Sequence, residues 1–196
     1  MTVFLHRNWI VAAALLLAAC TSAPPPTNFP RLTYSHLGAF DLDVSSIEIV
    51  EAFQPSLAPP NVDHMMPVAP AAAARRWAED RLRAVGSLGQ RAVFTIEDGA
   101  VTATPLKRET GIRGVVTVDQ SERYDAILAV RLEIFDINGR RVATAEATAR
   151  RSRSVPENIT LADRDKVWFS ITETLANDLN AELDKAIPQF LGAYLR

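Results

Sequence analysis

The sequence predicts an α+β fold of the two-layer sandwich type, in which a mainly antiparallel sheet of about four strands carries two helices on one face. Three features predict this fold. Several short segments alternate apolar and polar residues, as half-buried strands do. A long hairpin is centred on an Asn-Gly pair, and the C-terminal part has the apolar spacing of an amphipathic helix. The expected order is strand, helix, three strands, helix.

The first half of the predicted domain contains a strand, a helix and a second strand. Residues 46–53 form the first strand, with one apolar face made of Ile47, Ile49 and Phe53. Residues 71–85 form a helix that ends at Gly86, because four apolar side chains follow helical spacing: Ala74, Ala78, Leu82 and Val85. Residues 91–106 form the second strand, which we expect to be bent or interrupted at residues 97–99, by a bulge or a tight turn.

A hairpin over residues 124–152 is the clearest local signal. We expect Asn138 and Gly139 to form a two-residue type I′ turn, which fixes the register of the two strands. On one face each large aliphatic side chain then meets an alanine, in the pairs Ile134 with Ala143, Leu132 with Ala145, Val130 with Ala147, and Leu128 with Ala149. On the other face Arg131 opposes Glu146. The row of alanines leaves room for a helix close to the sheet.

The last element is that helix. From Asp163 onward an apolar stripe recurs at intervals of three and four residues, formed by Trp168, Ile171, Leu175, Leu179 and Leu183. Thr160 and Asp163 have the spacing of a capping box, with Asp in place of the usual Glu or Gln. Pro188 removes one backbone hydrogen bond, so we expect the helix to kink or end near it.

The N-terminus has the features of an export signal. His6 and Arg7 precede an uncharged apolar run of 11 residues, 9–19, which is about half the roughly 20 that a spanning helix needs. The chain's single cysteine, Cys20, follows Ala19, and this pattern resembles the lipobox of bacterial lipoproteins. The resemblance implies cleavage between Ala19 and Cys20, with a diacylglycerol on the sulfur and an N-acyl chain on the new terminus. A plain export signal and a buried helix are the alternatives.

These boundaries give three parts: a signal peptide over residues 1–19, the lipidated Cys20 with a proline-rich tether over residues 20–30, and one periplasmic α+β domain over residues 31–196. The tether contains four prolines and no charge, which favours an extended chain reaching roughly 30 Å. Thr21 stands where Asp would mark inner-membrane retention in the enterobacterial sorting rule, so the outer membrane is favoured over the inner one. The protein is expected in the cell envelope, lipid-anchored and facing the periplasm.

The composition argues against two classes of function. Without the leader, 177 residues remain with 20 basic and 23 acidic side chains, a formal charge of −3, which disfavours nucleic-acid binding. No G-x-S-x-G, H-E-x-x-H, P-loop or dinucleotide motif is present, and only His36 and His64 remain outside the leader. We therefore expect no enzyme, no metal site and no cofactor beyond the covalent acyl groups on Cys20. An envelope hydrolase is the least favoured alternative.

A long proline-rich loop is the first candidate binding surface. Residues 55–70 contain five prolines and place His64, Met65 and Met66 where a partner can bind, since long loops in small domains are often functional. In the alternative interpretation Val62, Met65 and Met66 cover one end of the core.

A group of arginines is the second candidate surface, and it comprises Arg140, Arg141, Arg150, Arg151 and Arg153. Guanidinium groups pair well with phosphates, so this end of the sheet is a candidate site for lipopolysaccharide or another anionic lipid. The alternative is a solvated edge whose charges prevent unwanted strand pairing.

The second half of the domain resembles the lipopolysaccharide-assembly lipoprotein family called LptE. The resemblance lies in Glu122-Arg123-Tyr124-Asp125 entering a strand, in the turn Ile137-Asn138-Gly139-Arg140, and in the amphipathic helix with Leu175 and Leu179. It implies a two-layer accessory protein that plugs a β-barrel partner, with Arg150, Arg151 and Arg153 as the carried-over lipid contacts. The other family with this general appearance is the auxiliary lipoprotein of ABC-type lipid or intermembrane transporters, which contacts transporter components.

Overall fold

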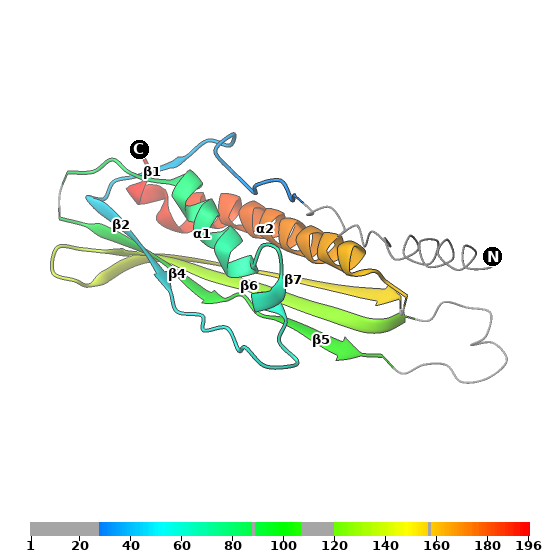
Figure 1. The fold of residues 1–196 in the computed structure, drawn as a ribbon. Helices are drawn as coiled ribbons and strands as arrows, with labels where there is room; N and C mark the ends of the chain where they lie inside the picture. Colours follow the sequence, from blue (N-terminus) through cyan, green and yellow to red (C-terminus); the bar gives the residue numbers. More distant parts are fainter. Residues whose placement is uncertain (1–27, 88, 107–119, 157) are drawn as a thin grey trace, which may run out of the picture.

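The computed structural model describes residues 28–87, 89–106, 120–156 and 158–196. The predicted signal peptide, the lipidation site Cys20 and most of the tether lie outside these residues. The described chain forms a sheet layer and a helix layer, with both long helices on one face of the sheet (Figure 1). The α+β two-layer prediction is confirmed.

Nine strands and helices and two 3₁₀ turns follow one another in the described residues. They are β1 (Phe40–Leu42), β2 (Ser46–Glu51), the 3₁₀ turn η1 (Asp63–Met65), α1 (Pro70–Arg81), β3 (Leu82–Ala84), β4 (Arg91–Asp98), β5 (Val101–Pro105), β6 (Gln120–Phe135), β7 (Arg141–Pro156), α2 (Leu161–Leu191) and the 3₁₀ turn η2 (Gly192–Tyr194). β6 pairs with β7 along one edge and with β4 and β5 along the other, while β2 extends the sheet beyond β4.

β4 and β5 together form the bent strand that the sequence predicts over residues 91–106. Both run antiparallel to β6, and the register shifts between Ile96 and Asp98, where Glu97 is the extra residue of a bulge. Beyond the bulge the register is unbroken, because Asp98 pairs with Ala129 and Val101 with Ala126. The sheet is therefore about four strands wide, and it is mixed because β2 runs parallel to β4.

The register of the β6–β7 hairpin is the predicted one, but its turn differs. All four aliphatic-alanine pairs and the Arg131–Glu146 pair occur as expected. Gly139 has a φ of 75°, whereas Asn138 does not have the positive φ that a type I′ turn requires. One carboxylate oxygen of Asp136 accepts the backbone N–H groups of Asn138 and Arg140, each at 2.9 Å. This side chain stabilises a three-residue loop in which Gly139 takes the left-handed position.

The alanine row of β7 carries α2. Ala145, Ala147 and Ala149 are buried, and α2 packs mainly on β7 and less on β6. Its predicted stripe is buried, from Trp168 to Leu183. Thr160 caps the helix, because its hydroxyl oxygen accepts the backbone N–H of Asp163 at 3.1 Å. Pro188 does not end the helix, which continues to the buried Leu191.

The helix predicted over residues 71–85 is too long. α1 ends at Arg81, and Leu82–Ala84 is β3, which pairs in parallel with β1. Val85, the expected last member of the buried stripe, is 39% exposed. Gly86 does not stop the helix; a Cβ added there would lie 2.5 Å from the backbone of Asp43 and Val44. Strand pairing with β1, which sequence periodicity does not reveal, overrides the helical pattern.

A polar network joins the two helices. The Trp77 indole N–H donates to the Asn180 side chain at 2.7 Å, and Asn180 donates to Asp184 at 2.9 Å. Arg81, only 5% exposed, pairs with Asp184 at 2.5 Å. Its guanidinium also lies 4.8 Å from the centre of the Phe40 ring, a cation–π contact. The network fixes α1 against α2, and breaking it would leave a buried guanidinium without its partner.

A larger side chain in the alanine row should destabilise the fold. Leucine at Ala147 must displace α2, so Ala147→Leu is expected to lower the free energy of unfolding by about 1–3 kcal/mol. The matched control is Thr148→Leu on the next residue, which is exposed on the opposite face of the sheet and should change stability by about 0.5 kcal/mol or less. Urea unfolding measures both. Equal effects of the two substitutions would contradict the packing of α2 on this row.

Candidate functional site

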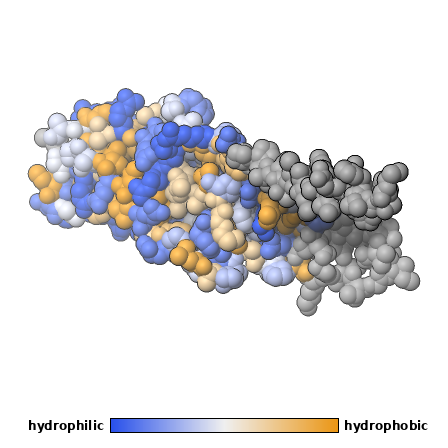
Figure 2. All heavy atoms as spheres, viewed as in Figure 1, coloured by the Kyte–Doolittle hydropathy of each residue, from blue (hydrophilic) through white to orange (hydrophobic). Residues whose placement is uncertain are grey.

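The face of the sheet opposite the two helices has mainly polar side chains, with Val93 and Ile127 among them. Arg131 lies at its centre and forms ion pairs with Glu97 on β4 and with Glu146 on β7, the latter at 3.0 Å. Thr148 and Arg150 are exposed farther along β7. We call this surface the open face. Figure 2 shows hydrophilic and hydrophobic residues interspersed on the side of the molecule in view, and the exposed large apolar residues are scattered over several elements.

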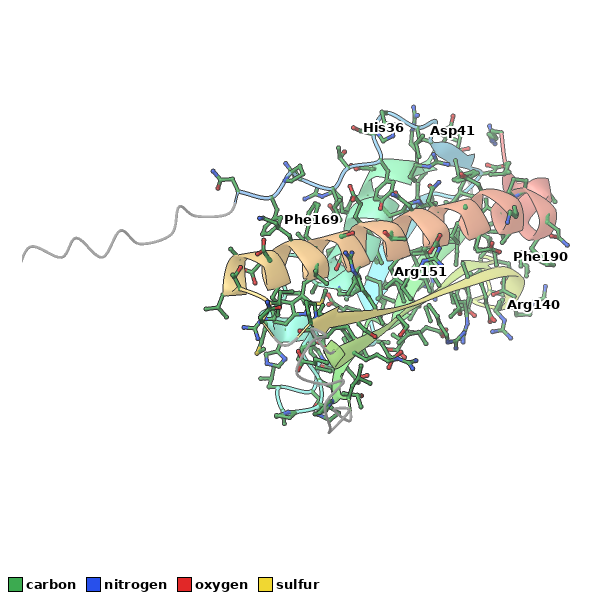
Figure 3. The ribbon with its side chains drawn as sticks, turned by 90° about the vertical axis from the view of Figure 1, so that its right-hand side faces the viewer. His36, Asp41, Arg140, Arg151, Phe169 and Phe190 are labelled. Atoms are coloured by element: carbon green, nitrogen blue, oxygen red, sulfur yellow. The ribbon has the colours of Figure 1, made fainter. Side chains whose placement is uncertain are left out.

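The five arginines singled out in the sequence lie in three different places. Arg140 and Arg141 lie at the hairpin end, where they pair with Asp136 and Glu133 at 2.9 and 2.8 Å. Arg151 and Arg153 point to the helix side and reach Asp178 and Ser170 of α2, at 2.5 and 3.3 Å (Figure 3 labels Arg151). Arg150 lies on the open face and is exposed. They do not form one continuous basic surface.

A shallow groove lies where β5, β6 and β7 run side by side. It has a volume of about 510 Å³ and is lined by Ala100, Thr102, Arg123, Asp125, Ala126, Ile127, Arg150, Arg151 and Ser152. Thr102, Asp125 and Ser152 form one row across the three strands. Small side chains in this part of the sheet leave the hollow, and two arginines of neighbouring strands, Arg123 and Arg150, border it.

The charges of this groove are unevenly matched. Arg123 donates to Asp125 from Nε and Nη2 at 3.0 and 2.7 Å, and from Nε to the Ser152 hydroxyl oxygen at 2.8 Å. The hydrogen bonds from Arg123, followed by that from Ser152, hold the pKa of Asp125 below its usual range. Arg151 is paired with Asp178. Within the described part of the chain Arg150 has no ion-pair partner, so one cation of the groove is unmatched.

The proline-rich loop is divided between core and surface. Met66 is 8% exposed and belongs to the core, so the expectation of an accessible methionine pair is wrong for this residue. Met65 is 52% exposed and His64 is exposed. Met65 borders a hollow of about 470 Å³ with Phe29, whose ring stacks on Phe169 at 4.9 Å between centroids. The loop covers one end of the core and leaves Met65 as its accessible apolar side chain.

A third hollow, of about 360 Å³, lies between the N-terminal segment and α2. Its titratable lining residues are Arg31, Tyr34, His36 and Glu173. Burial, followed by the negative charges of Glu173 and Asp80, raises the pKa of Tyr34 to about 12. No group of three or more metal-ligating side chains occurs in the described residues. Over the same residues, none of the helices combines the length and the hydropathy needed to span a bilayer.

Neither a family model nor a curated protein matches the sequence. Among solved structures, a minor lipoprotein of Acinetobacter baumannii is 12% identical, with 76% of this chain and 96% of its own covered and a TM-score of 0.35. Rare lipoprotein B of Shewanella oneidensis is 10% identical, with 74% and 96% covered and a TM-score of 0.39. Lipoprotein GNA1162 of Neisseria meningitidis is 11% identical, with 67% and 98% covered and a TM-score of 0.24. These three similar structures are bacterial lipoproteins, and at such TM-scores no property is transferred from them.

Arg123 is the groove residue that the sequence interpretation missed as a binding candidate. The hairpin register contains part of the signal, because it places Asp125 opposite Ser152 and Ile127 opposite Arg150. The sequence does not predict that β5 pairs with β6, because no short turn connects these two strands.

The Tyr34 hydroxyl gives a pH-dependent test of how the N-terminal segment packs. The unfolded chain loses this proton near pH 10, whereas the folded protein keeps it up to about pH 12. The stability that neutral Tyr34 contributes is therefore present below about pH 10 and is lost as the pH rises towards 12. Between about pH 9 and 12, the free energy of unfolding of Tyr34→Phe should fall by about 2 kcal/mol less than that of the parent, as measured by urea unfolding. Equal losses would show that Tyr34 is not buried against α2.

Proposed function

We propose that this protein is a non-enzymatic, lipid-anchored lipoprotein of the bacterial envelope that binds an outer-membrane β-barrel partner through its open face, as an accessory in assembly or transport. The observation that carries the proposal is the polar open face, which lies opposite the two helices. A surface of this kind suits a water-filled, polar partner surface such as the lumen of a barrel. The leader pattern ending at Cys20 supports the anchor.

The point where the tether joins the domain supports a placement in which the domain extends away from the membrane. Phe29, close to where the tether joins, stacks on Phe169 near the beginning of α2. Arg140 in the hairpin turn and Phe190 near the end of α2 lie at the opposite end of the molecule (Figure 3). β6 and β7 have 16 residues each, a length of roughly 50 Å for an extended strand. An anchor at the tether thus lets the open face extend away from the membrane.

One observation favours the auxiliary lipoprotein of an ABC-type transporter as a second candidate. Met65 is 52% exposed beside a hollow that Phe29 and Val68 also line, and such an exposed side chain suits a protein partner that offers an apolar side chain. Phe190, near the C-terminal end of α2, is 55% exposed. It lies at the opposite end of that helix from Phe169, which stacks on Phe29 of this hollow (Figure 3). The exposed apolar side chains are therefore far apart, whereas the open face has mainly polar side chains, and we favour the barrel partner.

Removing the lipidation site tests the anchor. Cys20→Ala should leave the chain uncleaved or unacylated, because no other thiol can accept the diacylglycerol. The measurement is the mass of the processed protein together with its distribution between membrane and soluble fractions. A Cys20→Ala protein that is still fully processed and membrane-bound would refute lipidation at this residue.

Photo-crosslinking in cells tests the partner surface. A benzoyl-phenylalanine at Thr148, exposed on the open face, should give an adduct with an outer-membrane β-barrel protein, identified by mass spectrometry. The same photo-crosslinking residue at Met65 tests the proline-rich loop. Placed at Lys185, which is exposed on α2, it is the matched control. Adducts with transporter components from Met65, and none with a barrel from Thr148, would replace the barrel proposal with the auxiliary one.

A further inference from the structure

We infer that one end of the domain, formed by Phe29, Met65 and Leu161, docks on the surface of the bilayer that holds the anchor. We call this surface the tether end. Its apolar side chains enter the interfacial region of the lipid, and β6 and β7 then point away from the membrane. The inference rests on the anchor part of the proposed function and not on its barrel partner. It also gives Met65 a different occupant from the transporter component of the second candidate.

The first argument is that apolar side chains gather at this end. Leu161, Asp165 and Phe169 recur every four residues at the beginning of α2, so they lie along one face of the helix. Phe29 stacks on Phe169, and it lines a hollow of about 470 Å³ together with Met65 and Asp165. Leu161 is 71% exposed and Met65 is 52% exposed. Two accessible apolar side chains and an aromatic ring therefore border the beginning of α2.

The second argument is the short distance to the anchor. Asn28 lines the same hollow, and residues 21–27 separate it from Cys20. A chain of this length spans at most roughly 25–30 Å, so acyl chains on Cys20 place the bilayer within that distance of the tether end. A short linker raises the local concentration of a second binding surface to roughly millimolar. A contact too weak to recruit a free protein is then sufficient to hold a domain that is already attached.

The third argument is the balance of charge at the tether end. Lys166 pairs with Asp163 at 2.9 Å, and Arg31 and Asp165, which have opposite charges, line the hollow. The guanidinium of Arg164 lies over an aromatic ring of the same helix. Clusters of several basic residues attract anionic lipids, and this mixed surface is of another kind. Apolar contact is therefore the source of binding, so a zwitterionic bilayer should be sufficient.

The test uses the full-length lipidated protein in phosphatidylcholine vesicles, with one nitroxide label. Because Cys20 is the single cysteine and is acylated, Leu161→Cys, Met65→Cys and Ile137→Cys each supply the only free thiol. Power-saturation electron paramagnetic resonance compares collisions with oxygen, which concentrates in lipid, and with a water-soluble nickel chelate. Labels at Leu161 and Met65 should collide preferentially with oxygen. Ile137, which is apolar and 78% exposed in the hairpin turn at the opposite end, is the matched control and should collide mainly with nickel.

A second variant separates docking on lipid from burial within the protein. Leu161→Asp places a carboxylate where the lipid would lie, and the cost of removing this charge from water should release the domain. The nickel collisions of a label at Met65 should then rise to about those measured at Ile137. Ile137→Asp is the matched control and should leave the label at Met65 protected.

Three outcomes would overturn the inference. Equal nickel collisions at all three labels would show that the tether end stays in water. Protection that requires added phosphatidylglycerol would replace apolar contact with attraction to anionic lipid. Protein that does not sediment with the vesicles would refute the anchor, and with it the docking. Because no barrel is present, the adducts at Thr148 do not bear on these results, and the partner proposal can fail separately.

Discussion

The row of small side chains on β7 is the constraint on which the rest of the structure depends. Ala145, Ala147 and Ala149 allow the 31-residue helix α2 to lie close against the strand, and the buried aliphatic residues of β6 fill the space beside it. Close packing of this kind has little tolerance for added volume. The hairpin and the helix therefore specify each other, and the position of α2 defines which face of the sheet is covered.

The covered face then decides where function can lie. α1 is held beside α2 by the Arg81–Asp184 pair and by the hydrogen bond from Trp77 to Asn180, so both helices occupy the same layer. The opposite face of β4, β5, β6 and β7 carries neither helix, and most of its side chains, such as Arg131, Thr148 and Arg150, are polar for that reason. A sheet with one solvated face offers a wide, rigid surface, and the groove beside Arg150 is a local hollow in it.

Ion pairing distinguishes arginines that the sequence presents as equivalent. Arg140 and Arg141 neutralise acids of the hairpin end, and Arg151 secures β7 to α2 through Asp178. Exposed pairs of this type contribute little to stability, about 1 kcal/mol or less each, but they remove the donors from ligand binding. Arg150 is different because its strand position turns it to the face without helices. Placement relative to the sheet, and not residue type, makes it the candidate contact.

The sequence by itself determined the features that depend on local periodicity and short-range pairing. The hairpin register, the buried stripe of α2 and the Thr160 cap follow from alternation, a tight turn and helical spacing, all of which act over a few residues. Only the tertiary structure decided the end of α1, the burial of Met66 and the groove. Each depends on segments distant in the chain, as when β1 converts Leu82–Ala84 into a strand or β5 brings Thr102 beside Asp125. The free energy of these contacts comes from pairing between segments that are distant in the chain, so no local sequence pattern predicts them.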